Sequence, residues 1–92
     1  MSWYQKFEKH SEMWHLFTDF WKVVQNYWNM EDTDQYWDSM IGACTDFVNR
    51  HPFVFSKLLI GAFIEEQERK RKKLPDRIEE YARWEEKHSA TR

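Results

Sequence analysis

The hydrophobic positions of residues 3–30 repeat with the period of a helix and occupy an unusually wide face. Two interleaved series, spaced three and four residues apart, run along this segment. They are Trp3, Phe7, His10, Trp14, Phe17, Trp21, Val24 and Trp28, and Met13, Leu16, Phe20, Val23, Tyr27 and Met30. Together they cover about 220° of the helix, whereas a helix with one neighbour needs about 100°. The pattern therefore predicts one long helix that is covered from two sides.

The tryptophans of this helix leave two interpretations open. Trp14, Trp21 and Trp28 fall seven residues apart, and they can either fill a core or form an interface, which tryptophan often anchors. Tryptophan is too wide for the layers of a simple two-stranded coiled coil, so we expect a bundle. Because so much apolar surface is hard to bury within 92 residues, we also expect a homo-oligomer.

Two further helices follow after polar breaks. The second is predicted over 33–50, where Thr33 or Asp32 can cap the first turn. Its apolar positions again have a helical period: Tyr36, Trp37, Met40, Ile41, Ala43, Cys44, Phe47 and Val48. The third is predicted to begin at Pro52, a residue suited to the first turn of a helix. Residues 53–64 are apolar nearly all round, which indicates a central element or half of an oligomer interface.

The C-terminal part of the chain is more polar. Residues 65–73 have no apolar face, but three acid–base pairs four residues apart favour a helix that extends into water. The pairs are Glu65–Arg69, Glu66–Lys70 and Glu68–Lys72. A weaker fourth helix from Pro75 has a thin apolar stripe of Leu74, Ile78, Tyr81 and Ala82. It can pack loosely, swap onto a neighbouring chain or fray.

These patterns predict an all-α fold. We expect a compact bundle of three main helices in residues 1–74 and a weaker C-terminal helical segment in residues 75–92. The composition agrees, because 2 glycines and 2 prolines are too few for the turns of a β-sandwich or barrel.

Charge is divided unevenly along the chain. Residues 1–68 hold 11 acids and 5 bases, and residues 69–92 hold 5 acids and 9 bases, within a total net charge of −2. The basic run comprises Arg69, Lys70, Arg71, Lys72 and Lys73. It can contact phosphates, or it can be a solvated helix face paired with the upstream acids. No aromatic residue interrupts the run, so base stacking is not indicated there.

An acidic cluster surrounds two aromatic residues near the start of the second helix. The six residues are Glu31, Asp32, Asp34, Tyr36, Trp37 and Asp38. Acids around exposed aromatics can bind a basic protein surface, because charge speeds encounter and sets register. The other interpretation is a capped and well-solvated start of a helix.

Signals for catalysis are weak. Glu12–His15 and Glu85–His88 have the spacing of metal ligands on one helix face, but no inward-facing partners complete a set. Cys44 lies within an apolar stripe, which is typical of a buried structural cysteine. The sequence contains no glycine-rich phosphate loop. We therefore expect no metal, no cofactor and no enzymatic activity.

The expected location is the cytoplasm. The chain opens without a signal-peptide pattern, and a single cysteine suits a reducing compartment. The longest apolar run, residues 53–64, is shorter than the roughly twenty residues that span a membrane, and it contains Lys57. We expect no membrane association.

The segment FTDFWKVVQNYWNMEDTDQYWDSMI, followed by HPFVFSKLLIGAFIEEQE, resembles small reading frames carried by bacterial phages and integrative elements. The shared features are an aromatic first helix, an ED-x-D-x-YW join and a third helix with the pattern PF…L…AF…E. The resemblance covers roughly residues 14–70 and carries no catalytic signature. It implies a context in which small proteins inhibit host defence systems, anti-CRISPR proteins among them.

The sequence therefore favours a non-catalytic helical protein-binding module. With the resemblance, the expected partner is a bacterial defence nuclease that the protein inhibits. The alternative is a small helical nucleic-acid-binding protein that uses residues 69–73.

Overall fold

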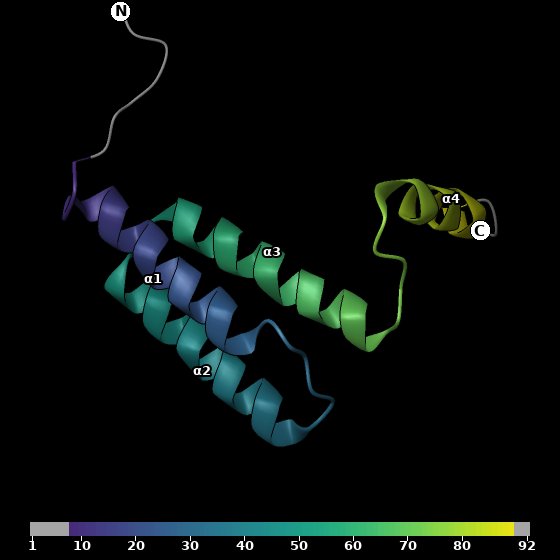
Figure 1. The fold of residues 1–92 in the computed structure, drawn as a ribbon, viewed down its shortest axis with the longest axis horizontal. Coiled ribbons are helices and arrows are strands. Elements are labelled where there is room, and N and C mark those ends of the chain that lie inside the picture. The colour runs from purple at the N-terminus through teal and green to yellow at the C-terminus, as the bar shows by residue number, and fades with distance from the viewer. Residues whose placement is uncertain (1–7, 90–92) are drawn as a thin grey trace, which may run out of the picture.

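The computed structural model describes residues 8–89, which form four helices. They are α1 (Glu12–Tyr27), α2 (Asp34–Arg50), α3 (Val54–Arg71) and α4 (Ile78–Ser89). Each of α1, α2 and α3 packs against the other two, and α4 lies apart from them beyond a short link (Figure 1). The expected all-α bundle of three main helices is confirmed.

α1 is shorter than the helix predicted over 3–30. The Ser11 hydroxyl accepts a hydrogen bond from the Trp14 N–H, which is the geometry of a helix cap. His10 has a φ of 68°, a left-handed conformation that no α-helix can pass through. The helix therefore begins at Glu12, and the predicted continuation through His10 is wrong. Trp3 and Phe7 lie outside the described residues.

α2 begins as expected, and α3 begins two residues later than expected. The Thr33 hydroxyl accepts from the Tyr36 N–H over 3.1 Å and caps α2. The Phe53 N–H donates to the His51 carbonyl, which places Pro52 in a tight turn rather than in the first turn of α3.

The end of α3 is closed by a left-handed residue. Lys73 has a φ of 57°, and its N–H donates to the Lys70 carbonyl. The next N–H, of Leu74, reaches back to the Arg69 carbonyl over 3.1 Å. This pair of bonds is the Schellman arrangement, which satisfies carbonyls that the last helical turn leaves open.

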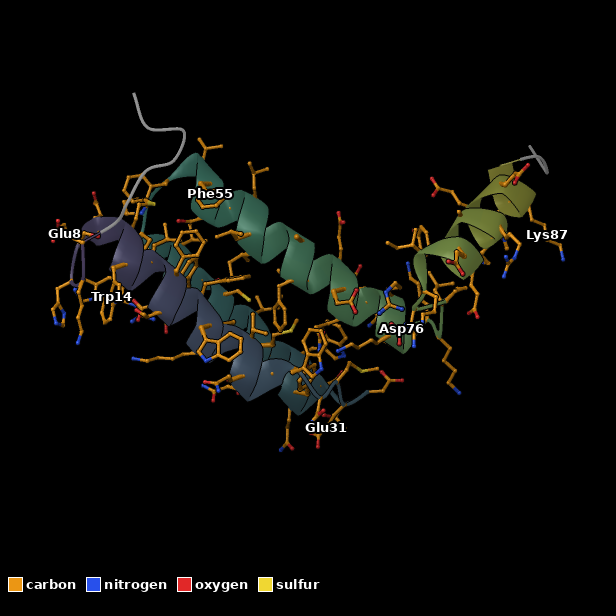
Figure 2. All side chains as sticks on the ribbon, turned by 45° about the horizontal axis from the view of Figure 1, so that its top comes forward. Glu8, Trp14, Glu31, Phe55, Asp76 and Lys87 are labelled. Carbon is orange, nitrogen blue, oxygen red and sulfur yellow. The ribbon has the colours of Figure 1, made fainter. Side chains whose placement is uncertain are left out.

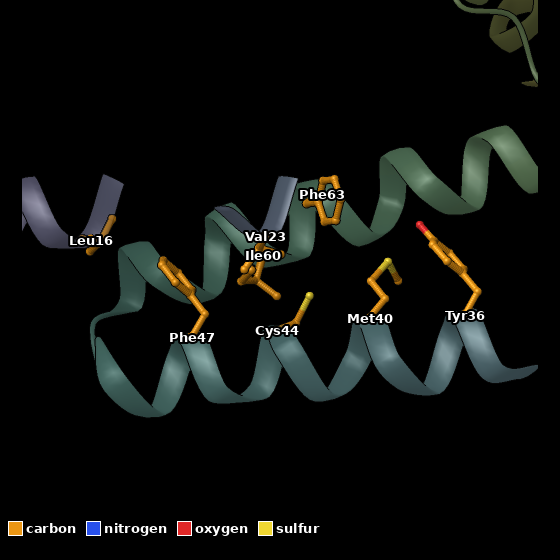
Figure 3. Packing of buried hydrophobic residues seen from close by; sticks show 8 residues of the cluster. All are labelled: Leu16, Val23, Tyr36, Met40, Cys44, Phe47, Ile60 and Phe63. Atoms are coloured by element: carbon orange, nitrogen blue, oxygen red, sulfur yellow. The ribbon is translucent and has the colours of Figure 1, made fainter. Parts of the chain in front are cut away.

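The core lies between the three bundle helices and runs along their length. Figure 2 labels Phe55, in the first turn of α3, and Trp14 at one end of the bundle, and Glu31 in the loop at the other end. α2 supplies four of the eight buried apolar residues, at a helical spacing that points them toward α1 and α3 (Figure 3). The eight are Leu16, Val23, Tyr36, Met40, Cys44, Phe47, Ile60 and Phe63. Within residues 8–89, no helix has the length and apolar character needed to cross a membrane.

Candidate protein-binding site

An apolar groove lies along α1 on the side that α2 does not cover, and α3 contacts it at both ends. We define this aromatic groove by Phe17, Trp21, Val24, Trp28 and Phe55. The side chains of Trp21 and Trp28 are 60% and 48% exposed. Large apolar side chains with this exposure are typical of interaction sites rather than of a closed monomer surface.

Both ends of the aromatic groove are fixed by contacts between α1 and α3. At one end, the rings of Phe17 and Phe55 meet edge to face at 5.9 Å. At the other end, the Lys70 ammonium lies 3.4 Å from the centre of the Trp28 ring, a cation–π contact. Between them, Trp21, Val24, Gln25 and Trp28 line a shallow hollow of about 490 Å³.

α1 has the two predicted neighbours, α2 and α3, but they leave the arc around Trp21 largely uncovered within one chain. α2 and α3 both pack on the arc that carries Leu16 and Val23, which are buried. Trp21 lies on the other arc and faces solvent, while Trp14 is half-buried beside the rings of His10 and His15. Of the three predicted interface tryptophans, Trp21 and Trp28 thus share the groove.

A buried polar network holds the Trp28 end of the groove in place. The amide nitrogen of Gln67 lies 2.7 Å from the Tyr27 carbonyl oxygen, 3.1 Å from that of Trp28 and 2.8 Å from the Tyr36 hydroxyl. Lys70 also donates to the Trp28 carbonyl over 2.8 Å, and burial lowers the pKa of its ammonium. The backbone below the Trp28 ring is therefore tied to α3 at two points.

Sequence reasoning missed Gln67 and Phe55. The charge pattern of residues 65–73 predicts a helix that points into water, but Gln67 is fully buried. A signal was present, because Gln67 continues the helical spacing of Ser56, Ile60 and Phe63. Phe55 belongs to a stretch that is apolar nearly all round, so periodicity alone does not select it.

The acids of the cluster are exposed to solvent, but its two aromatic side chains are not. Glu31, Asp32, Asp34 and Asp38 are exposed around the start of α2. Tyr36 points into the core, where burial raises the pKa of its hydroxyl. Trp37 is half-buried, and the Arg71 guanidinium covers its ring at 4.9 Å. The expectation that both aromatics are exposed is therefore wrong.

Three residues of the basic run have structural partners. Arg69 bonds to the carboxylates of Glu66 and Asp76 and to the carbonyls of Leu74 and Pro75. These contacts replace the predicted Glu65–Arg69 pair, because the chain after α3 turns back toward the guanidinium.

Lys70 and Arg71, as described above, cover Trp28 and Trp37. Arg71 also pairs with Glu68 at 4.0 Å. Lys72 and Lys73 are exposed. The run is therefore largely part of the bundle's own architecture.

An ion pair closes the end of the bundle opposite Gln67. The Asp19 carboxylate lies 2.7 Å from Nε2 of the buried His51 and 3.5 Å from Arg50. Burial alone raises the pKa of Asp19, but the His51 hydrogen bond and the nearby positive charges outweigh it and hold that pKa below its ordinary value. This pair joins α1 to the turn between α2 and α3.

The described residues offer little for catalysis or metal binding. Within residues 8–89, no group of three histidine, cysteine or acidic side chains could hold a metal ion. Burial raises the pKa of the Cys44 thiol to about 11, which makes it a poor nucleophile. The aromatic groove is thus the strongest candidate site. No protein-family model matches the chain, and no match was found among curated proteins or among solved structures.

Proposed function

We infer that the protein is a non-catalytic protein-binding module and that its partner inserts an apolar helix into the aromatic groove. The observation that carries this proposal is the 60% exposure of Trp21 between two fixed α1–α3 contacts. Tryptophan is among the residues that contribute most binding energy at interfaces. An amphipathic helix that lays its apolar face on an apolar groove is a common form of recognition between proteins.

The groove is well prepared for binding because its walls are already ordered. Phe17 is held against Phe55, and Trp28 is held by Lys70 and by the network around Gln67. A partner therefore has fewer side chains to immobilise when it binds, which preserves affinity.

The narrower proposal is that the partner is a bacterial defence nuclease that the protein inhibits. It rests on the resemblance to proteins of phages and integrative elements. The exposed carboxylates of Asp34 and Asp38 support it, because they can attract the basic surface of an enzyme that handles nucleic acid.

The binding proposal is tested with two apolar-to-acid variants. Tagged wild-type protein is used to capture a partner from a bacterial lysate, and the affinity is then measured with purified partner. Trp21→Glu is expected to weaken binding at least about tenfold. Ile41→Glu is the matched control, because Ile41 is a 43% exposed apolar residue beside a different hollow, between α2 and α3. Equal affinity of all three proteins would contradict the proposal.

The nuclease proposal has its own test in a nuclease-interference assay. The wild-type protein is expected to protect a target DNA, and Asp34→Lys combined with Asp38→Lys is expected to slow association most strongly at low salt. If the wild-type protein gives no protection, the narrower proposal is wrong and the binding proposal is unaffected.

Nucleic-acid binding through Arg69, Lys70, Arg71, Lys72 and Lys73 has less support, because the first three already bond within the chain or cover its aromatic rings. The expected result of a salt titration with DNA or RNA is weak binding that depends on Lys72 and Lys73. Tight binding that falls steeply with salt and is lost in Lys72→Gln/Lys73→Gln would favour this alternative instead.

A further inference from the structure

α4 faces the last turns of α3 across open hollows and does not close on them. It contains 12 residues and packs against none of the other three described helices. Isolated helices of this length are marginal in water, because few hydrogen bonds offset the cost of the first turn. Ile78 is 87% exposed, and Tyr81, Ala82 and Trp84 continue its apolar stripe along one side. Its own chain therefore covers the stripe only in part, because Tyr81 is half-buried in a hollow shared with Arg69, whereas Ile78 and Ala82 stay exposed.

The link before α4 holds this helix away from its own bundle. Arg69 donates to the carbonyls of Leu74 and Pro75 over 3.1 and 3.0 Å and bonds to the Asp76 carboxylate. Together with the left-handed Lys73, these bonds set the direction in which the chain leaves α3. Figure 1 shows α4 beyond the end of α3, on no face of the bundle. The aromatic groove of the same chain is therefore out of its reach while these bonds persist.

We propose that α4 of one chain packs into the aromatic groove of a second copy, and that two copies exchange α4 reciprocally to form a symmetric dimer. Each copy has one unpartnered helix and one unfilled groove, so a twofold arrangement satisfies both. Charge also fits: α4 carries four acids against two bases, and the Lys70 ammonium lies over the Trp28 ring at one end of the groove. The dimer goes beyond the proposed function, since it requires no foreign partner.

Light scattering tests the dimer and the two surfaces together. The wild-type protein is expected to have twice the chain mass of 11.5 kDa. Trp21→Glu in the groove and Ile78→Glu on the α4 stripe are each expected to give monomers in which the three-helix bundle still unfolds cooperatively. Arg83→Gln is the control on α4, because it changes the charge by the same amount on the opposite face. Monomeric wild-type protein, or a dimer that both acidic variants retain, overturns the proposal.

Disulfide trapping identifies which surfaces meet. Gln25→Cys, at the groove hollow, and Ala82→Cys, on the α4 stripe, are made in separate chains with different tags and mixed. Oxidation is expected to link the two chains to each other, whereas Arg83→Cys in place of Ala82→Cys is expected to give no specific link. A doubly substituted Gln25→Cys/Ala82→Cys chain that closes on itself as a monomer contradicts the exchange.

These results are separable from those that test the proposed function. A monomer whose partner binding depends on Trp21 overturns the exchange and leaves the binding proposal standing. If Trp21→Glu converts the dimer into a monomer and the wild-type protein captures no partner, only the exchange is supported. If both proposals are right, α4 of the second copy and the partner's helix compete for the same groove. Added partner is then expected to convert the dimer into a complex that contains one copy of this chain.

Discussion

The Gln67 amide nitrogen lies 2.8 Å from the Tyr36 hydroxyl oxygen, and both groups donate to one acceptor, the carbonyl oxygen of Tyr27. This acceptor lies at the C-terminal end of α1, where helical carbonyls lack partners within the helix. The arrangement joins all three bundle helices and supplies one carbonyl with two donors from different helices.

This redundancy predicts non-additive effects of substitution. Tyr36→Phe or Gln67→Met alone leaves the Tyr27 carbonyl one donor, so each is expected to lower the free energy of unfolding by about 1 kcal/mol. The double variant removes both donors from the part-buried Tyr27 carbonyl. Its loss is expected to exceed the sum of the single losses by about 1 kcal/mol or more. Urea unfolding of the four proteins measures this difference.

Thr45→Ala provides the control for that cycle. The Thr45 hydroxyl donates to the Ile41 carbonyl over 2.9 Å on the exposed side of α2. Combined with Tyr36→Phe, it is expected to give additive losses within about 0.5 kcal/mol. Strictly additive losses for Tyr36 and Gln67 as well would mean that the shared acceptor does not couple them.

The contact between Asp19 and His51 predicts how the free energy of unfolding depends on pH. Because the pKa of Asp19 is lowered on folding, its contribution is fully present above the unfolded value of 3.8 and is lost as the pH falls through the folded value. Asp19→Asn is expected to lower the free energy of unfolding by about 1.5 kcal/mol at neutral pH. The difference between the two proteins is expected to shrink below pH 3.8. Unfolding curves across this range measure it, and a difference that grows in acid would contradict the assignment.

Cys44 is expected to be nearly inert toward thiol reagents in the folded protein. With a pKa of about 11, only roughly one thiol in a thousand is ionised at pH 8, and the side chain is buried. Labelling by a disulfide reagent is expected to be at least about 100-fold slower in native buffer than in denaturant. Equal rates in the two conditions would show that the core around Cys44 is open.

The left-handed backbone conformation of Lys73 predicts that a substitution by glycine is stabilising. Its φ of 57° is unfavourable for a residue with a Cβ and favourable for glycine. Lys73→Gly is therefore expected to raise the free energy of unfolding by about 0.5–1 kcal/mol. The neighbouring Lys72 has a φ of −81°, so Lys72→Gly is expected to be neutral or destabilising. Thermal unfolding compares the two, and the same sign for both would refute the explanation.

Most of the fold could be predicted from the sequence because helical periodicity is strong in α1 and α2. The cap of α2 also follows from sequence, since Thr33 precedes the first periodic turn. The start of α1 does not, because nothing in the apolar spacing reveals that His10 is left-handed. The start of α3 was also missed, because Pro52 suits a first helical turn and the competing Phe53–His51 bond depends on a turn that periodicity does not encode.

The candidate site was predicted only in part. The sequence selected Trp21 and Trp28, but whether they fill the core depends on which arc of α1 is covered by α2 and α3. Gln67 looked like one more polar residue in a charged run, since its acceptors lie about forty residues earlier in the chain. For the same reason Arg69 and Lys70 looked solvated, although each bonds to backbone carbonyls. Contacts between distant segments decide these cases, and local spacing does not record them.

The exposure of Trp21 gives the protein an optical reporter of its own. An indole in water emits at longer wavelengths than one surrounded by apolar side chains, and Trp37, half-buried beneath Arg71, lies outside the groove. Whatever covers the groove, whether a helix from a sister chain or one from another protein, should shift the emission toward the blue. Its arrival and departure can then be timed in solution without attaching a dye.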